Sequence, residues 1–245
     1  MAKLKYVSGN DVKSINMRDI KHMRRLRVAL YMPFKYICDR LSSFLASIML
    51  LVPLLVLCVW IMIEDFGNPF FFHRRVGKDG REFTMLKLRS MKKGADDLEN
   101  TLSGSDLEKY LIEYKLEDDP RLIGWEKSGD SRKCFGAFLR RTSLDELPQI
   151  FWNILIKGNM SVVGPRPILR EEMDKNYTPE EQAQLLSVKP GLTGYWQAYA
   201  RNNATYEKGD RQRMELFYVR NCSMWLDLKI LFATVGAVIR EDGAR

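Results

Sequence analysis

Two adjacent acidic residues, Asp145 and Glu146, are the strongest candidates for chemistry in this sequence. They follow Thr142 and Ser143 at an expected helix start, where free backbone N–H groups and the helix dipole attract phosphate. Adjacent carboxylates also suit Mg²⁺, which takes one or two carboxylates together with substrate phosphates. The pair is therefore a candidate site for phosphate and Mg²⁺.

A structural interpretation of the same residues is open. Ser143-x-x-Glu146 is a capping box, and acidic residues favour helix N-termini without any catalytic role. Pro148 has no N–H and fits best within the first turn of a helix, which moves the expected cap to Asp145 or close by. Both interpretations place the acidic pair at a helix start.

Several arginines could complete a phosphate site, because a guanidinium makes bidentate contacts with phosphate. Arg140 precedes the acidic pair, Arg166 is held between two prolines, and Arg201 stands before two asparagines. Each of them alone can also be a solvated surface residue. Their value as candidates depends on whether the fold brings them to the acidic pair.

Histidine and cysteine chemistry is disfavoured. The sequence contains two histidines, His22 and His73, and both lie near a long apolar stretch. It lacks a P-loop, a G-x-G-x-x-G fingerprint, an H-E-x-x-H motif and a G-x-S-x-G elbow, so carboxylates would have to do any acid–base work. The four cysteines form no C-x-x-C pair, which fits a reducing compartment and supports neither a disulfide framework nor a zinc site.

The composition indicates anionic partners. The 245 residues include 39 Lys and Arg against 31 Asp and Glu, a formal charge of +8. This excess suits anionic membrane lipids, at about 1 kcal/mol per nearby basic side chain, and phosphate-bearing substrates. Nucleic acid is not expected as a partner, because the sequence has no long basic helix, zinc-finger spacing or RNA-binding signature.

The apolar stretch from Leu41 to Ile63 runs for 23 residues without a charge. As a helix it would be roughly 34 Å long, enough to cross a bilayer core. Pro53 lies at its middle, where proline breaks or kinks a helix at a cost of about 3 kcal/mol. Basic residues flank both ends, and Lys and Arg collect on the cytoplasmic side, so we expect a re-entrant helix that bends at Pro53 and returns. A spanning helix with a proline kink is the alternative.

The other elements predict an α-rich α+β fold on this anchor. A basic arm over 1–34, with a helical stripe ending near Pro33, precedes the re-entrant helix over 35–66. Residues 67–245 form the expected cytosolic catalytic domain at the membrane surface, and its last helix, apolar with an early Trp225, suits an amphipathic helix in the membrane interface. We expect a strand over 83–88 and helices over 105–114, 144–154, 211–220 and 225–239, with one more from 178.

Several ordered motifs together resemble the bacterial sugar transferase family, the monotopic phosphoglycosyl transferases. They cover about residues 35–235, and their order and spacing make the resemblance far more specific than any single motif. The matching stretches are Lys35–Arg40, Phe83–Met91, Asp119–Arg121, Phe138–Gln149, Met160–Pro167, Lys189–Gly194 and Trp225–Ile230.

The resemblance implies an activity. Family members transfer a sugar 1-phosphate from a UDP-sugar to undecaprenyl or another polyprenyl phosphate, and release UMP. The reaction would be the first membrane step of glycoconjugate or exopolysaccharide synthesis, at the cytoplasmic face of the bacterial inner membrane. The enzyme would need Mg²⁺ and would lie on the membrane without crossing it.

The resemblance also implies roles for residues. Asp145 would be the nucleophile, forming a covalent phosphosugar intermediate, and Glu146 would bind Mg²⁺ and help to hold the acceptor. Arg140 and Arg166 would steady phosphate groups, and we assign Arg89, from a matching stretch, to the same set. Pro53 would match the family's helix break. Arg201 is a candidate from the residues alone, since the resemblance assigns it no role.

Two other functions remain open at this point. One is a membrane-anchored glycosyl transferase that moves sugar without phosphate and would release UDP. The other is a non-catalytic basic scaffold on the membrane surface. Asn159 stands where many family members have Asp, and residues 122–137 and 150–158 are apparent insertions. The sugar carried, and whether the chain forms a homo-oligomer, do not follow from the sequence.

Overall fold

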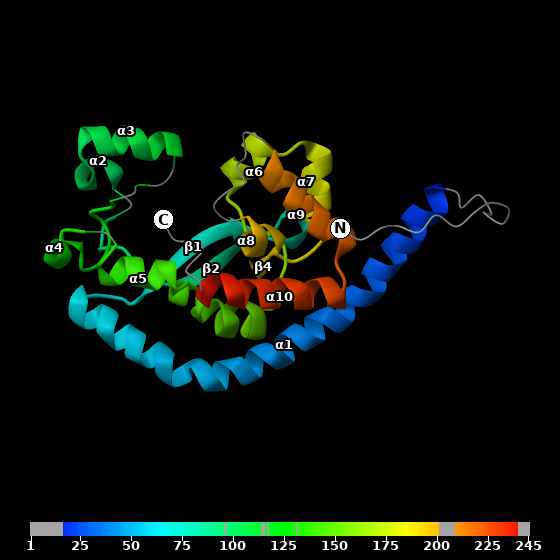
Figure 1. The fold of residues 1–245 in the computed structure, drawn as a ribbon, viewed down its shortest axis with the longest axis horizontal. Helices are drawn as coiled ribbons and strands as arrows, with labels where there is room; N and C mark the ends of the chain where they lie inside the picture. The colour runs from blue at the N-terminus through cyan, green and yellow to red at the C-terminus, as the bar shows by residue number, and fades with distance from the viewer. Residues whose placement is uncertain are drawn as a thin grey trace.

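The computed structural model describes residues 17–95, 97–113, 116, 118–130, 132–200 and 209–239. In these ranges one long helix lies along a domain of short helices and two small sheets (Figure 1). The expected α-rich fold with few short strands is confirmed.

The long helix α1 (Met17–Glu64) has 48 residues and is continuous through both Pro33 and Pro53. The helix end expected near Pro33 is therefore wrong. Tyr31 and Lys35, on either side of that proline, both bind Asp227, so tertiary contacts outweigh the local cost of the proline. The boundary expected between residues 34 and 35 falls inside the helix.

The second proline is accommodated by curvature. Figure 1 shows α1 as a continuous arc whose concave side faces the domain, without a sharp break at Pro53. Nearby, Ser47 donates a hydrogen bond from Oγ to the Ser43 carbonyl at 2.6 Å, the kind of side-chain contact that supports irregular helices in apolar surroundings. The chain therefore changes direction gradually across the apolar stretch.

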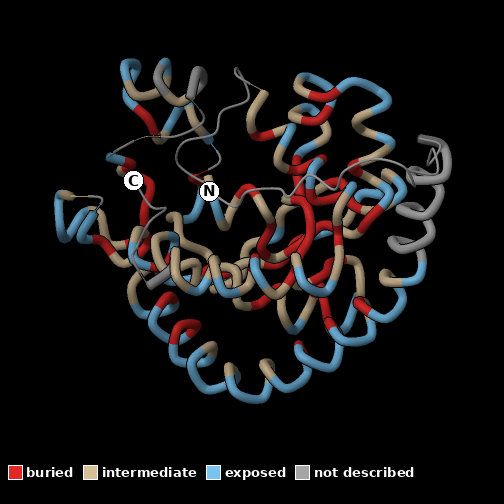
Figure 2. Tube along the Cα trace, turned by 45° about the vertical axis from the view of Figure 1, so that its right-hand side comes forward, coloured by how far each residue is buried: buried red, intermediate tan, exposed pale blue. Residues whose placement is uncertain are grey.

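The convex side of α1 is exposed and apolar. The segment Leu30–Glu64 is long and apolar enough to cross a membrane by length and composition, and only 17% of its most apolar window is buried. The core helix of a soluble protein would be mostly buried, whereas Figure 2 shows most of this arc as exposed or intermediate. The most exposed apolar side chains in this stretch include Leu41, Leu45, Met49, Val52 and Ile63.

Two small sheets form the centre of the domain. Strands β1 (Phe70–Val76) and β2 (Glu82–Leu88) make an antiparallel hairpin closed by a short turn, η1 (Lys78–Gly80). The second strand confirms the predicted strand, whereas the first was not predicted. Strands β3 (Ser161–Val163) and β4 (Gly191–Thr193) pair in parallel.

Nine helices complete the described part of the domain, and those expected from 178 and over 211–220 and 225–239 are confirmed. The helix from 178 begins with a capping box in which Thr178 Oγ1 accepts from the Glu181 N–H at 3.3 Å. The nine are α2 (Leu98–Thr101), α3 (Gly104–Glu113), α4 (Trp125–Ser128), α5 (Phe135–Arg141), α6 (Arg170–Asn176), α7 (Pro179–Leu185), α8 (Tyr195–Tyr199), α9 (Asp210–Asn221) and α10 (Met224–Ile239).

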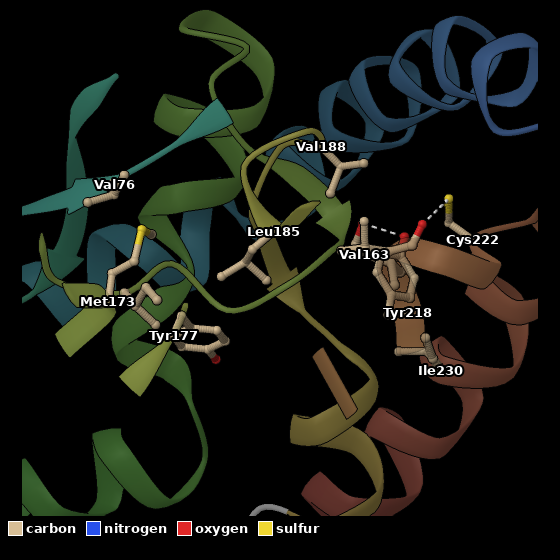
Figure 3. Close-up of a cluster of buried hydrophobic side chains, with 11 residues drawn as sticks. Val76, Val163, Met173, Tyr177, Leu185, Val188, Tyr218, Cys222 and Ile230 are labelled. Carbon is tan, nitrogen blue, oxygen red and sulfur yellow. Dashed lines mark hydrogen bonds between the residues drawn. The ribbon is translucent and has the colours of Figure 1, made fainter. Parts of the chain in front are cut away.

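Buried apolar clusters hold the domain and its anchor together. The largest joins β1, β3, α6, α7, α9 and α10, and contains Val76, Met173 and Ile230 (Figure 3). A second cluster packs Leu57 and Ile61 of α1 against residues of β2 and α5. This contact places the C-terminal end of the apolar helix beside β2, whose Lys87 contacts the acidic pair.

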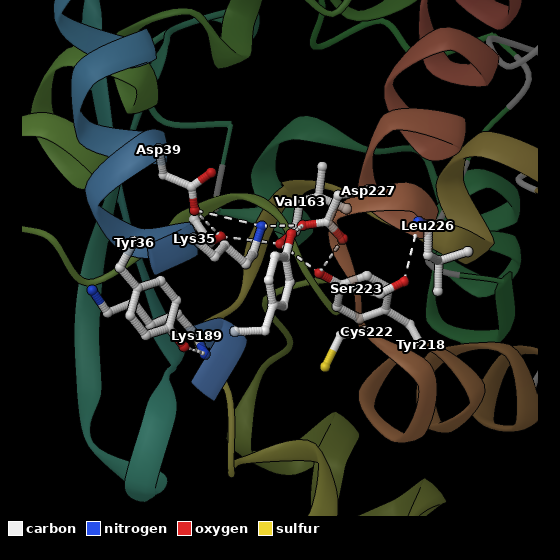
Figure 4. A network of polar contacts seen from close by, with 12 residues as sticks. Lys35, Tyr36, Asp39, Val163, Lys189, Tyr218, Cys222, Ser223, Leu226 and Asp227 are labelled. Atoms are coloured by element: carbon white, nitrogen blue, oxygen red, sulfur yellow. Dashed lines mark hydrogen bonds and ion pairs between the residues drawn. The ribbon is translucent and has the colours of Figure 1, made fainter. Parts of the chain in front are cut away.

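The N-terminal half of α1 is held by polar contacts (Figure 4). Lys35 Nζ lies 2.5 Å from an Asp227 oxygen and 3.5 Å from an Asp39 oxygen. The Tyr31 and Tyr218 hydroxyls each donate to Asp227 at 2.8 Å, and the Ser161 hydroxyl donates to Asp39. We call the six residues the anchor network: Tyr31, Lys35, Asp39, Ser161, Tyr218 and Asp227.

Candidate active site

The acidic pair lies on a 3-10 turn, η2 (Leu144–Glu146), that is followed by a π-helix, η3 (Ile150–Ile156). The single regular helix expected over 144–154 is therefore wrong. Pro148 has no N–H to donate to the carbonyl of residue 144, four positions earlier. The turn closes instead with hydrogen bonds to the residue three positions earlier, such as Glu146 N–H to the Ser143 carbonyl at 3.1 Å.

The capping interpretation is also not supported. Ser143 has a φ of 57°, in the left-handed region that few non-glycine residues adopt, and its side chain makes no capping hydrogen bond. The strained residue turns the chain sharply after α5. Both acidic side chains are then presented toward β2.

Asn153 of η3 fixes this turn against the strand. Its side-chain oxygen accepts from the Leu86 N–H at 3.0 Å, and its amide nitrogen donates to the Thr84 carbonyl at 2.8 Å. The side chain is fully buried, so both bonds form away from water, where they are hard to replace. The sheet and the acidic turn are therefore positioned as one unit.

Lys87 of β2 joins the two acids. Its Nζ lies 2.7 Å from Glu146 Oε1 and 3.5 Å from Asp145 Oδ2. One ammonium thus bridges two adjacent carboxylates and offsets the repulsion between them. We call Lys87, Asp145 and Glu146 the candidate triad.

The environment of Asp145 makes its carboxylate basic. Burial raises the pKa of this carboxyl above the ordinary aspartate value, and Glu146 raises it further, while Lys87 and Arg140 lower it. A desolvated carboxylate is a better nucleophile than a solvated one, and the nearby cations favour its ionised form. Asp145 is thus a poorly hydrated carboxyl group with Lys87 and Arg140 nearby.

Two polar side chains of β1, His73 and Arg75, contact each other, and the charge of Lys87 acts on His73. Burial, together with the charges of Arg75, Lys87 and Arg166, lowers the pKa of His73 to about 4, so this imidazole is neutral at pH 7. The Arg75 guanidinium lies 3.4 Å from His73 Nδ1 and 3.7 Å from a carboxylate oxygen of Glu172. The charges of Lys87 and Arg75 therefore both act on His73, while each of these cations is also paired with a carboxylate.

Arg166 lies on the turn before α6, and its charge acts on His73. Its guanidinium stacks over the Trp196 ring at 5.3 Å, and its N–H donates to Glu215 at 3.1 Å. The turn that carries it is held against β4, because Gly191 N–H donates to the Pro165 carbonyl at 2.8 Å. The backbone and the guanidinium of Arg166 are therefore both held by contacts within the domain.

This arrangement agrees with what known proteins indicate. A family model described as bacterial sugar transferase matches residues 30–241. The chain belongs to the bacterial sugar transferase family. The sugar transferase motifs thus include both the acidic turn and the anchor network.

Several curated proteins are similar to this chain. A UDP-galactose-lipid carrier transferase from Erwinia amylovora is 40% identical over 82% of this chain and 39% of its own length. An undecaprenyl-phosphate galactose phosphotransferase from Salmonella typhimurium is 37% identical over 84% of this chain and 41% of its own length. The exopolysaccharide production protein ExoY from Rhizobium meliloti is 37% identical over 84% of this chain and 85% of its own. The chain spans about two fifths of the length of the first two relatives.

The structure brings some of the predicted site residues together and not others. It brings Arg140 close enough to the acidic pair for its charge to act on Asp145, whereas the charge of Arg166 acts on His73. Arg201 lies outside the described residues. The catalytic and binding roles assigned to these side chains remain predictions.

Arg89 does not face the triad through its guanidinium contacts. Its Nε donates to the Asn68 carbonyl at 2.8 Å, Nη2 donates to the Asp65 carbonyl at 2.6 Å, and Nη1 pairs with the Asp65 carboxylate. These bonds fasten the loop after α1 to the end of β2. The geometry favours a structural role for Arg89 over the phosphate binding that we expected.

Sequence reasoning missed Lys87, although a signal was present. Residues 83, 85 and 87 share one face of the predicted strand, and the first two are apolar. A lysine on an otherwise apolar face must have a partner when it is buried. The position of that partner, on a turn 58 residues later, could not be read from the strand.

The triad can supply only part of a metal site. In the described part of the chain, no group of three or more His, Cys, Asp or Glu side chains is arranged to hold a metal ion. Mg²⁺ is commonly bound by one or two carboxylates together with substrate phosphates, and Asp145 with Glu146 offers that donor set. The residues therefore fit Mg²⁺ that arrives with a nucleotide substrate.

Proposed function

We propose that this sugar transferase moves a sugar 1-phosphate from a UDP-sugar to undecaprenyl phosphate, giving undecaprenyl diphosphate sugar and UMP. The observation that carries the proposal is the candidate triad, in which a desolvated aspartate is paired with a lysine, while Arg140 adds a second positive charge that acts on the same carboxylate. The names of the relatives support the same substrate classes. The proposed product is the starting lipid for exopolysaccharide or glycoconjugate assembly.

In the first step the Asp145 carboxylate attacks the β-phosphorus of the UDP-sugar. The bond from that phosphorus to the oxygen bridging the two phosphates breaks, and UMP leaves with the electron pair. The sugar phosphate stays on Asp145 as an acyl phosphate. Lys87 and Arg140 would offset the negative charge that attacker and substrate bring together.

In the second step a phosphate oxygen of the polyprenyl phosphate attacks the same phosphorus. The bond to Asp145 breaks, the carboxylate is restored, and a diphosphate forms on the lipid. Glu146, more exposed than Asp145, would orient the acceptor phosphate and share Mg²⁺ with Asp145. When bound, Mg²⁺ would neutralise phosphate charge during both transfers.

The anchor suits a lipid substrate whose phosphate lies at headgroup depth. We propose that α1 is re-entrant: the exposed convex side of the arc (Figure 1) dips into the cytoplasmic leaflet, and the helix contacts the domain near both ends of the apolar stretch, at Lys35 and at Ile61. Helix α10 would rest in the interface through exposed Trp225, Phe232 and Val235. The basic excess of the chain would favour anionic lipids.

Mass spectrometry of the intact enzyme tests the reaction. After incubation with Mg²⁺ and candidate UDP-sugars, without acceptor, wild type should gain the mass of one phosphosugar, and peptide mapping should place it on Asp145. Addition of undecaprenyl phosphate should discharge the adduct, with release of UMP. Release of UDP would indicate direct sugar transfer, and the absence of any turnover would indicate a scaffold.

Labelling of single cysteines tests the topology. Single cysteines are introduced at residues 30 and 75 in a variant without the four native cysteines. An impermeant reagent should label both in inverted vesicles, whose cytoplasmic side faces outward, and neither in right-side-out vesicles. Residue 75 faces Glu172 in the domain, so position 74, which is exposed, is the matched site if labelling at 75 is slow. Labelling of the two ends from opposite sides would refute the re-entrant arrangement.

A further inference from the structure

The turn that carries Arg166 has one backbone donor. Pro165 and Pro167 have no N–H, so the peptide N–H of Arg166 is the only donor between residues 165 and 167. That donor is taken by a side chain, Glu215 of α9, whose Oε2 accepts it at 3.1 Å. The conformation of the turn thus depends on a residue almost fifty positions away.

Glu215 occupies a costly position. Its side chain is 2% exposed, and its second oxygen, Oε1, has no hydrogen-bond partner among the described residues. A leucine of similar size would fill the same space without placing a carboxylate in the core. The acidic group is therefore explained by what its first oxygen holds and not by packing.

A second contact controls the direction of the Arg166 side chain. The guanidinium groups of Arg166 and Arg211 lie 5.3 and 4.4 Å from the centroid of the Trp196 ring, which is buried. Such cation–π contacts keep a long side chain in one orientation. Glu215 fixes the backbone of Arg166, and Trp196 fixes its head.

This cluster is connected to the catalytic side of the domain. The Arg211 guanidinium lies 3.2 Å from one oxygen of Glu172, whose other oxygen lies 3.7 Å from Arg75. Arg75 in turn contacts His73, which experiences the charges of both Lys87 and Arg166. A shift of the Arg166 turn would therefore change the electrostatics near the triad.

We infer that Glu215 is a positioning residue of the transferase, which holds the Arg166 N–H so that the guanidinium of Arg166 is presented, on Trp196, to the phosphates of the donor. The inference rests on the proposed function, since it assumes a phosphate-bearing substrate. It assigns to α9 a part in donor binding, although Glu215 itself touches no reacting atom. Its effect should appear in the KM for the UDP-sugar more than in kcat.

A double-mutant cycle tests the inference. Glu215→Leu removes the acceptor and should lower kcat/KM for the UDP-sugar about tenfold, mainly through KM, because one buried hydrogen bond is lost. Glu215→Gln keeps an acceptor oxygen and should stay within about threefold of wild type. In an Arg166→Ala background, Glu215→Leu should have almost no further effect, because it acts through Arg166. Glu180→Leu, at an exposed position on α7, is the matched control for the change in charge.

The outcomes separate this inference from the proposed function. If wild type releases no UMP from any UDP-sugar, the proposed function fails. If wild type is active but Glu215→Leu costs the same tenfold with and without Arg166, or lowers kcat alone, the positioning role is refuted. Thermal melts accompany each variant. If Glu215→Leu does not fold, the cycle is run with Glu215→Asp, whose shortened side chain should give a smaller loss that also disappears in Arg166→Ala.

Discussion

Two lysines of this protein are each bridged between two carboxylates, with nearly the same geometry. In the anchor network, Lys35 lies 2.5 Å from Asp227 and 3.5 Å from Asp39. In the candidate triad, Lys87 lies 2.7 Å from Glu146 and 3.5 Å from Asp145. The same arrangement of charges serves a structural junction in one place and a candidate reaction centre in the other.

The surroundings make the difference. Three hydroxyl groups close the anchor network by donating to its carboxylates, and the Lys35 side chain is only 4% exposed. In the candidate triad the lysine side chain is 20% exposed and the Glu146 side chain is 27% exposed. A charge cluster whose lone pairs are occupied by the protein is rigid, whereas one that is open to solvent can exchange water for phosphate or Mg²⁺.

The largest expected effect concerns activity. Asp145→Asn should lower turnover by at least about 10³-fold, because an amide cannot form the acyl phosphate. Its thermal melt should match or exceed that of wild type, since burial already disfavours this charge. UMP release and melting temperature are measured on the same preparation. An active Asp145→Asn enzyme would contradict the covalent mechanism.

The equivalent change in the anchor network should act on stability. Asp227→Asn leaves Lys35 without its nearest partner and weakens two tyrosine hydrogen bonds, so we expect a loss of about 3–5 kcal/mol in the free energy of unfolding. Residual activity per folded molecule should stay close to wild type. Unfolding in detergent followed by circular dichroism, with activity measured at low temperature, separates the two effects. A melt equal to that of wild type would show that the network does not hold α1.

The sequence was sufficient for those parts of the fold that depend on local pattern. The strand ending at Leu88 and helices α7, α9 and α10 follow from periodicity and capping residues, and all were confirmed. The sequence also predicted that Arg140 lies near the acidic pair, because Arg140 is in the last turn of α5 and the pair follows a few residues later on η2. The roles of these residues remain predictions.

Long-range contacts explain what could not be predicted. Helix α1 continues through Pro33 because Asp227, almost two hundred residues later, binds Tyr31 and Lys35 on either side of this proline. Lys87 becomes a site residue only because Asn153 fastens η3 to β2. Arg89 was assigned to phosphate by resemblance, but its guanidinium is occupied by the loop after α1.

A smaller effect on activity is expected when the lysine of the candidate triad is removed. Lys87→Met should lower kcat/KM about 10²-fold, because both carboxylates lose a nearby cation while the nucleophile remains. Stability should change less than in Lys35→Met, since the partners of Lys87 can be hydrated. Kinetics and melts of the two variants, measured in parallel, compare the two lysines directly. Equal losses of stability would remove the distinction between an open and a closed cluster.

A third buried carboxylate, which has no lysine partner, should show the smallest effect. Burial raises the pKa of Glu215 from 4.5 to about 7 in the folded protein, against the charge of Arg211. Between those values the folded state keeps a proton that the unfolded chain releases, so Glu215 lowers stability as pH rises from about 4.5 to 7, and the loss is complete above 7. Glu215→Gln cannot titrate. Its stability relative to wild type should therefore increase by roughly 2–3 kcal/mol between pH 5 and pH 8, measured as the difference between the two melts. A difference that stays constant with pH would mean that this carboxyl titrates normally and that burial alone does not separate it from the two lysine-bound clusters.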